Sequence, residues 1–320
     1  MSTIEGIILT GSNNFFNVAC NDTVTRRCNL KGKILKPATG FHNPLAPGDK
    51  VIIEPDIHDN NEGQIIDLIP RKNSFGRFNE KSRLKQILAA NIDLLLCFTT
   101  PNAPPFRPRF LDRVLIQAES DNIPTLIVVN KIDLGIPKNV QDRIDNWKSL
   151  NYKVMLLSAK TKEGVKNLVE RISGLTITVT GQSGVGKSSL LNAIDPTLNL
   201  KTAELSRKEN RGNHTTIQGA YYNITSDICP NKTHKINLID TPGVRDFGIA
   251  GIDADDVALY FPEMESVIGK CKFGLSCTHK SEPGCKVLEL LHSGKIHKDR
   301  YESWLNIRAE LIARTKGIYD

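Results

Sequence analysis

Short, strand-like apolar runs fill the first seventy positions, and Asn, Gly, Pro and Asp separate them, as at 11–14, 44–49 and 59–63. The runs show no helical period. Several short strands without helices predict a small closed β-barrel, and an OB-fold is the simplest barrel of this size. The predicted strands are Ile4–Leu9, Phe15–Ala19, Thr23–Cys28, Lys50–Glu54 and Gln64–Ile69.

A different pattern follows a basic stretch, Arg71 to Lys85, which we interpret as a linker or a binding strip. Beyond it, buried-strand candidates alternate with helical stretches, which is typical of a mostly parallel sheet with helices on both faces. The strand candidates are Asp93–Phe98, Thr125–Val129, Val154–Leu157, Thr176–Thr180 and Lys235–Ile239. The helical stretches include Arg109–Ser120, Val140–Leu150 and Val165–Ser173.

Past Gly251 the pattern is helical on either side of a cysteine cluster, and a last helix runs from His297 to about Lys316. We therefore predict three domains. They are a β-barrel over 1–70, an α/β domain over 71–250 and a helical metal-binding domain over 251–320.

The composition fits this organisation. Of 320 residues, 39% are hydrophobic and 24% charged, which excludes a collagen, a coiled coil and a mainly disordered protein. The longest apolar run, Ile92 to Phe98 broken by Asp93, is far shorter than the roughly 20 residues of a membrane helix. No signal peptide is visible at the start, so we expect a soluble, cytoplasmic protein. The net charge of +7 fits either a polyanionic partner or a solvated basic surface.

Residues 181–188, Gly-Gln-Ser-Gly-Val-Gly-Lys-Ser, match the phosphate-binding motif GxxxxGK[ST]. They follow the predicted strand Thr176–Thr180 and open a helix near Ser188, which is the context that the motif requires. Glycines let backbone N–H groups surround the phosphates, and the helix N-terminus adds partial positive charge. Lys187 is expected to reach the β- and γ-phosphates, and the Ser188 hydroxyl to ligate Mg²⁺.

A base-recognition motif precedes this loop in the chain. Asn130-Lys131-Ile132-Asp133 fits NKxD and follows the predicted strand Thr125–Val129, at whose carboxyl end a ligand is expected. The Asp133 carboxylate can accept from N1–H and N2–H₂ of guanine together, a donor pair that adenine lacks. Sites built on such bonds reject the wrong ligand by as much as about 10⁴-fold.

Two further matches complete a nucleotide-binding set. Ser158-Ala159-Lys160 follows the next strand, where a backbone N–H could hold guanine O6. Asp240-Thr-Pro-Gly243 fits DxxG, in which Asp240 holds Mg²⁺ through water and the Gly243 N–H senses the γ-phosphate.

In the polar loop 211–216, either Thr215 or Thr216 could complete the Mg²⁺ shell.

Together the motifs predict a GTPase. Most GTPases place the phosphate loop first, whereas here NKxD and Ser158-Ala159-Lys160 precede it and DxxG comes last. This order predicts a circular permutation.

Three of the seven cysteines lie close together, in the pattern Cys271-x₅-Cys277-x-His279-x₅-Cys285. Three thiolates and one imidazole suit Zn²⁺, and a closed set of four ligands indicates one structural zinc rather than a catalytic one. The alternative is a group of buried thiols beside a surface histidine. Scattered cysteines elsewhere favour a reducing compartment over a disulfide framework.

The permuted order, the preceding barrel and the cysteine–histidine site resemble the bacterial ribosome small-subunit-dependent GTPase A family over essentially the whole chain. The passages that carry the resemblance are 90–93, 130–134, 181–192, 240–245, 261–263 and the zinc ligands. It implies an OB-fold, a permuted GTPase domain and a zinc-binding C-terminal domain. It also implies late maturation of the small ribosomal subunit through rRNA binding, with GTP hydrolysis stimulated by that particle. We expect a monomer with no membrane partner.

Motifs and resemblance together assign two sets of residues. The residues expected to bind the nucleotide and its Mg²⁺ are Asn130, Lys131, Ile132, Asp133, Ser158, Ala159, Gly181, Gln182, Ser183, Gly184, Val185, Gly186, Lys187, Ser188, Ser189, Thr215, Thr216, Asp240 and Gly243. The residues expected to bind zinc are Cys271, Cys277, His279 and Cys285.

Lys187 and His214 are the catalytic candidates. Val244 follows DxxG and cannot orient water as a glutamine would, so intrinsic turnover should be slow. In the resembling family a histidine of the first switch is thought to help, and it corresponds here to His214; the alternative for His214 is a contact with RNA or solvent. Asn213 and Ile217 stand where that family usually has Arg and Thr.

Two other functions remain as alternatives. The chain could be an RNA-binding module for which GTP is a structural ligand. A membrane-associated signalling GTPase is disfavoured because the sequence has no lipidation motif or amphipathic anchor.

Overall fold

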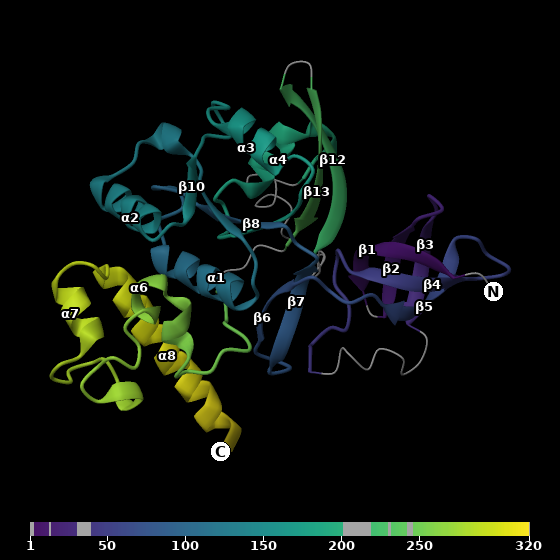
Figure 1. The fold of residues 1–320 in the computed structure, drawn as a ribbon. Helices are drawn as coiled ribbons and strands as arrows, with labels where there is room; N and C mark the ends of the chain where they lie inside the picture. The colour runs from purple at the N-terminus through teal and green to yellow at the C-terminus, as the bar shows by residue number, and fades with distance from the viewer. Residues whose placement is uncertain are drawn as a thin grey trace, which may run out of the picture.

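The structure is a computed structural model, and it describes residues 3–12, 14–30, 40–200, 219–229, 232–241 and 246–319. A small barrel, a central sheet flanked by helices and a helical C-terminal region follow one another along the chain (Figure 1). A two-stranded hairpin lies beneath the central sheet, between the barrel and the C-terminal region (Figure 1). No helix in these ranges combines the length and the apolar character needed to cross a bilayer.

The N-terminal barrel is closed by five strands in the order β1-β2-β3-β5-β4. β3 and β5 pair in parallel, and the other pairs are antiparallel. Alternate residues such as Ile8, Val18 and Ile53 are fully buried inside it. The predicted barrel is therefore confirmed. Its strands are β1 (Ile4–Ser12), β2 (Phe15–Cys20), β3 (Thr25–Leu30), β4 (Lys50–Pro55) and β5 (Glu62–Leu68).

The central sheet has six strands in the order β10-β9-β8-β11-β13-β12. The first five are parallel, and the edge strand β12 runs antiparallel to β13. The five predicted strands are present, but β12 was not predicted, because its exposed residues break the apolar run. The strands are β8 (Leu94–Thr99), β9 (Thr125–Val129), β10 (Lys153–Leu156), β11 (Thr176–Gly181), β12 (Ala220–Cys229) and β13 (Lys232–Asp240).

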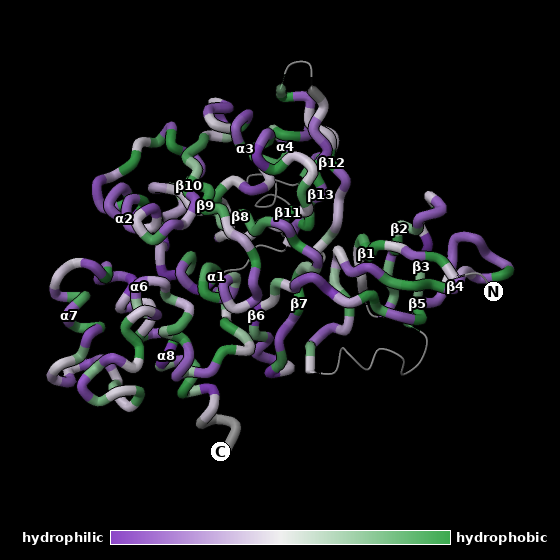
Figure 2. Tube along the Cα trace, viewed as in Figure 1, coloured by the Kyte–Doolittle hydropathy of each residue, from purple (hydrophilic) through white to green (hydrophobic). Residues whose placement is uncertain are grey.

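Helices cover both faces of this sheet, as the alternating pattern predicted. Leu95 and Cys97 pack towards α1 and α2, whereas Leu94 and Leu96 pack towards α3 and α4. A strand buried on both faces can be apolar along nearly its whole length, as β8 is (Figure 2), whereas threonines alternate with apolar residues in β11. The helices are α1 (Pro108–Ser120), α2 (Lys138–Ser149), α3 (Val165–Ile172) and α4 (Lys187–Ile194).

The basic stretch that we interpreted as a linker or a binding strip is mostly a hairpin, so the linker interpretation is wrong and the binding strip stays a prediction. β6 (Ser74–Asn79) pairs with β7 (Leu84–Ala90). Phe75 is fully buried and stacks on Phe247, with ring centroids 5.4 Å apart. The stretch contains many basic residues, so its sequence resembles a solvated linker, although buried apolar residues anchor the hairpin.

The C-terminal region is helical and encloses a core of its own. It contains α6 (Pro262–Glu265), α7 (Lys286–His292) and α8 (Lys298–Tyr319). Its core combines Trp304 and Ile307 of α8 with the three clustered cysteines, and it also takes in Ile116 of α1. The last helix therefore packs against the central domain.

A buried network of charges joins these two regions. Arg300 of α8 donates to Asp112 of α1 at 2.9 Å and to both carboxylate oxygens of Glu263 at 2.6 and 2.9 Å. Arg143 of α2 and the hydroxyl of Ser303 also donate to Asp112. Burial alone would lower the pKa of Arg300, but the carboxylates of Asp112 and Glu263 outweigh it and leave that pKa raised. The cation is therefore required at the centre of the network.

Arg300→Met is expected to lower the free energy of unfolding by about 3–5 kcal/mol, because it leaves buried carboxylates without their main cation. Chemical denaturation of the zinc-loaded chain measures this loss. Trp147 in α2 and Trp304 in α8 are the two tryptophans, and both are buried, so their fluorescence follows both sides of the network.

The control is Arg308→Met in the same helix. Arg308 pairs at 2.7 Å with Asp255, whose side chain is 86% exposed. Such pairs contribute about 0–1 kcal/mol, so this variant should remain close to the parent. Equal losses in the two variants would contradict the assigned role of the network.

Candidate functional site

The phosphate loop connects β11 to α4 over residues 182–186, as the motif predicted. Gly184 and Gly186 have φ of 84° and 92°, a region that favours glycine. A Cβ on Gly186 would lie 2.4 Å from Nδ2 of Asn130, so the loop can approach Asn130 only because this residue is glycine. No described side chain caps α4, and its first N–H groups are free to meet an anion.

Lys187, the first residue of α4, reaches back over the loop. Its Nζ donates to the carbonyl oxygens of Gly181 at 2.7 Å and Gln182 at 3.0 Å. Burial lowers the pKa of Lys187 to about 8, while the nearby Asp240 carboxylate acts in the opposite direction. Burial likewise raises the pKa of Asp240, which Lys187 partly offsets. Little water reaches this ammonium group, and its hydrogen-bond acceptors are two neutral carbonyl oxygens. Negatively charged phosphate oxygens would therefore stabilise its charged form.

Asn130 connects the three nucleotide-motif loops. Its Nδ2 donates to the carbonyl of Val185 in the phosphate loop at 2.9 Å. Its Oδ1 accepts from the backbone N–H of Lys131 at 2.8 Å and of Ala159 at 3.0 Å. Because Asn130 is 1% exposed, these bonds are shielded from water and fix the loops relative to one another.

Side chains of the base motif are held by their neighbours. Lys131 Nζ donates at 2.7 Å to the carbonyl oxygens of both Gly184 and Ala103. The Ser158 hydroxyl donates to Asp133 Oδ1 at 2.6 Å, and Ser158 itself is fully buried. Asp133 is exposed, so its second oxygen is open to a ligand.

The structure brings the described candidates together at one edge of the sheet. Asn130, Ser158, Gly181 and Asp240 lie at the carboxyl ends of β9, β10, β11 and β13, which is where open α/β sheets bind ligands. Four candidates lie outside the described residues: His214, Thr215, Thr216 and Gly243.

Sequence reasoning missed the loop that follows β8. Besides the Ala103 carbonyl, it brings Pro104 to 3.7 Å from the position of a Cβ on Gly184. The loop matches no nucleotide motif, and only its position after a central strand indicates a role at this edge.

The second candidate site is a metal centre. One ligand atom each from Cys271, Cys277, His279 and Cys285 lies within 4.8 Å of the others, and all four residues are buried. His279 Nδ1 is 3.5 Å from Cys271 Sγ and 3.3 Å from Cys285 Sγ, and the two sulfurs are 3.9 Å apart. Bond lengths of about 2.3 Å to sulfur and 2.0 Å to nitrogen place tetrahedral ligands about 3.5–3.8 Å apart, so the arrangement fits Zn²⁺.

Groups around the four ligands hold them in position. The backbone N–H of Lys286 donates to Cys271 Sγ at 3.3 Å, and the Tyr301 hydroxyl donates to the His279 carbonyl at 2.7 Å. The Trp304 ring lies 5.8 Å from the His279 ring, between centroids. These contacts tie the metal centre to α8.

A sequence profile described as RsgA GTPase matches residues 68–250, which is more than half of the chain. The chain belongs to the RsgA GTPase family. The family consists of hydrolases acting on GTP, so the predicted enzyme class is confirmed.

Curated relatives in the RsgA family match along nearly the whole chain. The small ribosomal subunit biogenesis GTPase RsgA of Borreliella burgdorferi (strain ZS7) is 38% identical over 312 residues, covering 97% of each chain. The protein of the same name from Chlorobaculum tepidum is 34% identical over 310 residues, covering 95% of this chain and 96% of its own.

Solved structures agree with the RsgA assignment. The crystal structure of YjeQ from Thermotoga maritima has a TM-score of 0.70 and 28% identity, covering 97% of this chain and 99% of its own. YloQ, described as a circularly permuted GTPase, has a TM-score of 0.65 and 23% identity, covering 98% of this chain and 96% of its own. The likeness to YloQ in fold confirms the predicted permutation.

Proposed function

We propose that this GTPase hydrolyses GTP to GDP and phosphate during late maturation of the small ribosomal subunit, and that the subunit stimulates the reaction. Relatives named for small ribosomal subunit biogenesis match it over 97% of its length, which supports the process and the partner. The convergence of the phosphate loop and the base motif on Asn130 carries the catalytic part of the proposal. We further propose that it acts as a monomer in the cytoplasm.

Guanine would bind between the base motif and the loop at Ser158. The Asp133 carboxylate accepts from two guanine donors and is itself held by Ser158, which supports discrimination against adenine. A backbone N–H of the loop at Ser158-Ala159-Lys160 is our candidate donor to guanine O6; the Ala159 N–H already donates to Asn130 Oδ1 at 3.0 Å, so guanine would have to replace that bond or use a neighbouring N–H.

The phosphates would lie on the loop and α4, held by backbone N–H groups and Lys187 while water attacks the γ-phosphate. Ser188 and Asp240 suit Mg²⁺, because each offers an oxygen, and the Ser188 hydroxyl has no partner among the described residues. Bound with GTP, Mg²⁺ neutralises charge on the phosphate oxygens. We retain either Thr215 or Thr216 for the same metal, Gly243 for the γ-phosphate and His214 for orienting water.

The outer face of the barrel is our candidate for rRNA contact. Phe15 on β2 is 45% exposed, and the Arg27 guanidinium on β3 lies 4.2 Å from its ring centroid. Their cross-strand partners on this face are Asn29 and Asn17. An exposed ring beside a cation and amides offers a stacking platform for an unpaired base.

Phe15→Ala is expected to weaken binding to the small subunit roughly 5- to 150-fold, because one stacked base contributes about 1–3 kcal/mol. Phe15→Tyr keeps the ring and should bind like the parent. Thr25→Ala changes another exposed residue of β3 and serves as the control. Equal affinities for Phe15→Ala and Thr25→Ala in a filter-binding titration at fixed salt would refute this contact.

The experiment that tests the proposed function is GTP turnover by the purified, zinc-loaded chain, alone and with small ribosomal subunits at low salt. We expect slow turnover alone and strong stimulation by subunits. Tight, GTP-dependent binding without stimulation would instead indicate an RNA-binding module gated by GTP. With neither effect, the proposed partner would be wrong.

A further inference from the structure

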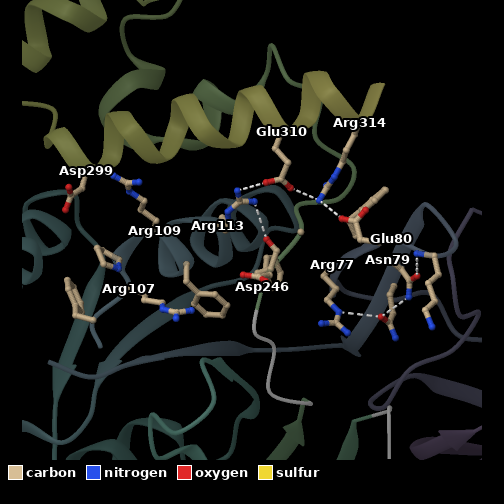
Figure 3. Close-up of a pocket in the computed structure, with 18 residues that line it drawn as sticks. Arg77, Asn79, Glu80, Arg107, Arg109, Arg113, Asp246, Asp299, Glu310 and Arg314 are labelled. Carbon is tan, nitrogen blue, oxygen red and sulfur yellow. Dashed lines mark hydrogen bonds and ion pairs between the residues drawn. The ribbon is translucent and has the colours of Figure 1, made fainter. Parts of the chain in front are cut away.

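A cavity of about 890 Å³ opens between the β6–β7 hairpin, the start of α1, residues 246–248 and α8 (Figure 3). None of the described nucleotide or zinc candidates lines it, so it is separate from both sites. Pockets of roughly 300–1,000 Å³ hold small ligands in proteins. The cavity is therefore large enough for a ligand of nucleotide size.

Ion pairs neutralise the side of the cavity formed by α8. Arg113 of α1 pairs with Glu310, and Arg314 pairs with both Glu310 and Glu80. Figure 3 shows these four side chains joined in one row beneath α8. Their charges are satisfied within the protein, so they are not expected to attract a ligand.

Two arginines away from that row have no carboxylate partner among the described residues. Arg77 of β6 is half-buried, and among the described residues its side chain makes one long hydrogen bond, of 3.4 Å, to the neutral side chain of Gln86. Burial lowers the pKa of Arg77, since no nearby anion offsets the loss of solvent. Arg107 is exposed and precedes α1, whose N-terminus no described side chain caps; it lies apart from Arg77, towards the other end of the cavity (Figure 3).

The remaining lining has complementary chemistry. The exposed Asp246 carboxylate accepts no hydrogen bond from described residues and can accept from a hydroxyl group. Phe106 provides apolar surface for a planar ring, whereas the ring of Phe78 lies against the Arg314 guanidinium, 4.1 Å from its centroid. Asp246 would repel additional negative charge, which favours a ligand with one phosphate over a triphosphate.

We propose that this cavity binds a ribonucleotide unit, with its phosphate on Arg77, a sugar hydroxyl on Asp246 and its base against Phe106. The unit is either one nucleotide of a single-stranded RNA or a free mononucleotide. The inference rests on the proposed function only where RNA is the source. A ligand there would also touch residues 246–248, which follow the DxxG motif and are held to the hairpin by the hydrogen bond from Phe78 N–H to the Gly248 carbonyl.

The test uses the full, zinc-loaded chain saturated with GDP, so that the phosphate loop is filled. Fluorescently labelled oligouridylate of eight nucleotides and unlabelled UMP are the two probes. We expect Arg77→Ala to weaken oligouridylate binding roughly tenfold or more, as befits loss of charged hydrogen bonds to phosphate. The DNA analogue, oligodeoxyuridylate, should bind less tightly because it lacks the 2′-hydroxyl.

Arg171→Ala is the matched control. Arg171 is exposed at the end of α3, away from the cavity lining, and its substitution removes the same positive charge. Competition by UMP would identify a free nucleotide as the source, and its absence would identify an RNA chain. A parent protein that binds neither probe, or equal losses in Arg77→Ala and Arg171→Ala, would overturn the inference. Subunit-stimulated GTP turnover, measured in parallel, would survive that failure if the proposed function holds.

Discussion

Replacing Lys187 with alanine is expected to lower subunit-stimulated GTP turnover by roughly 10²–10³-fold, the usual effect of removing one preorganised group that stabilises transition-state charge. The ammonium group lies over the phosphate loop, within 3.0 Å of two loop carbonyls that phosphate oxygens would replace as its partners. Turnover at saturating GTP and saturating subunits measures the effect. The control, Lys148→Ala, removes an exposed lysine from the last turn of α2.

The same substitution should remove a pH dependence. In the free protein the pKa of Lys187 is lowered to about 8 by burial. Bound phosphate favours the charged form, so above pH 8 binding must take up a proton, and GTP affinity should fall by up to about tenfold per pH unit. Below pH 8 this contribution is constant. Lys187→Ala cannot take up that proton and should show no such fall.

Two outcomes would contradict this assignment. Stimulated turnover in Lys187→Ala close to that of Lys148→Ala would exclude a role for the ammonium group in catalysis. If Lys187→Ala instead lost GTP affinity but kept its turnover at saturation, the group would serve ground-state binding alone.

Local chemistry explains why much of the site was predictable from the sequence. The phosphate loop is a short contiguous segment whose glycines and helix start define its shape, and β11 and α4 flank it as the motif requires. The cluster that could hold zinc was predictable for the same reason, because its four residues lie within fifteen positions and meet in space. The five barrel strands and five of the six central strands also follow from local apolar patterns.

Contacts between distant segments were not predictable. The bond from Asn130 to Val185 spans 55 positions, and the bond from Arg300 to Asp112 spans 188. The motif singles out Asn130 but not its partner, and in the sequence Arg300 and Asp112 look like ordinary solvated residues; only the packed fold shows which residues meet. The cavity between the β6–β7 hairpin, α1, residues 246–248 and α8 is a further case, since these four segments are far apart in the sequence.

Replacing Cys277 with serine is expected to release zinc and to disrupt the C-terminal region. A structural zinc contributes roughly 10–16 kcal/mol to the folding of small zinc-dependent domains. Here the three cysteines also form part of the core that contains Trp304 and Ile307, so loss of the metal would expose that core. The parent chain should contain about one zinc, the stoichiometry of a closed four-ligand site. Metal analysis of Cys277→Ser should find almost none.

A Trp147→Phe background isolates the fluorescence of Trp304, which lies beside His279 and should shift to longer wavelength as its surroundings become wet. Cys20→Ser is the matched control, because Cys20 is a buried thiol of the barrel, 7% exposed, outside the cluster. It should retain zinc and an unshifted Trp304 spectrum. A parent chain without zinc, or a Cys277→Ser chain that keeps its zinc, would show that the four side chains are ordinary core residues. The C-terminal region would then owe its stability to apolar packing and to the Arg300 network alone.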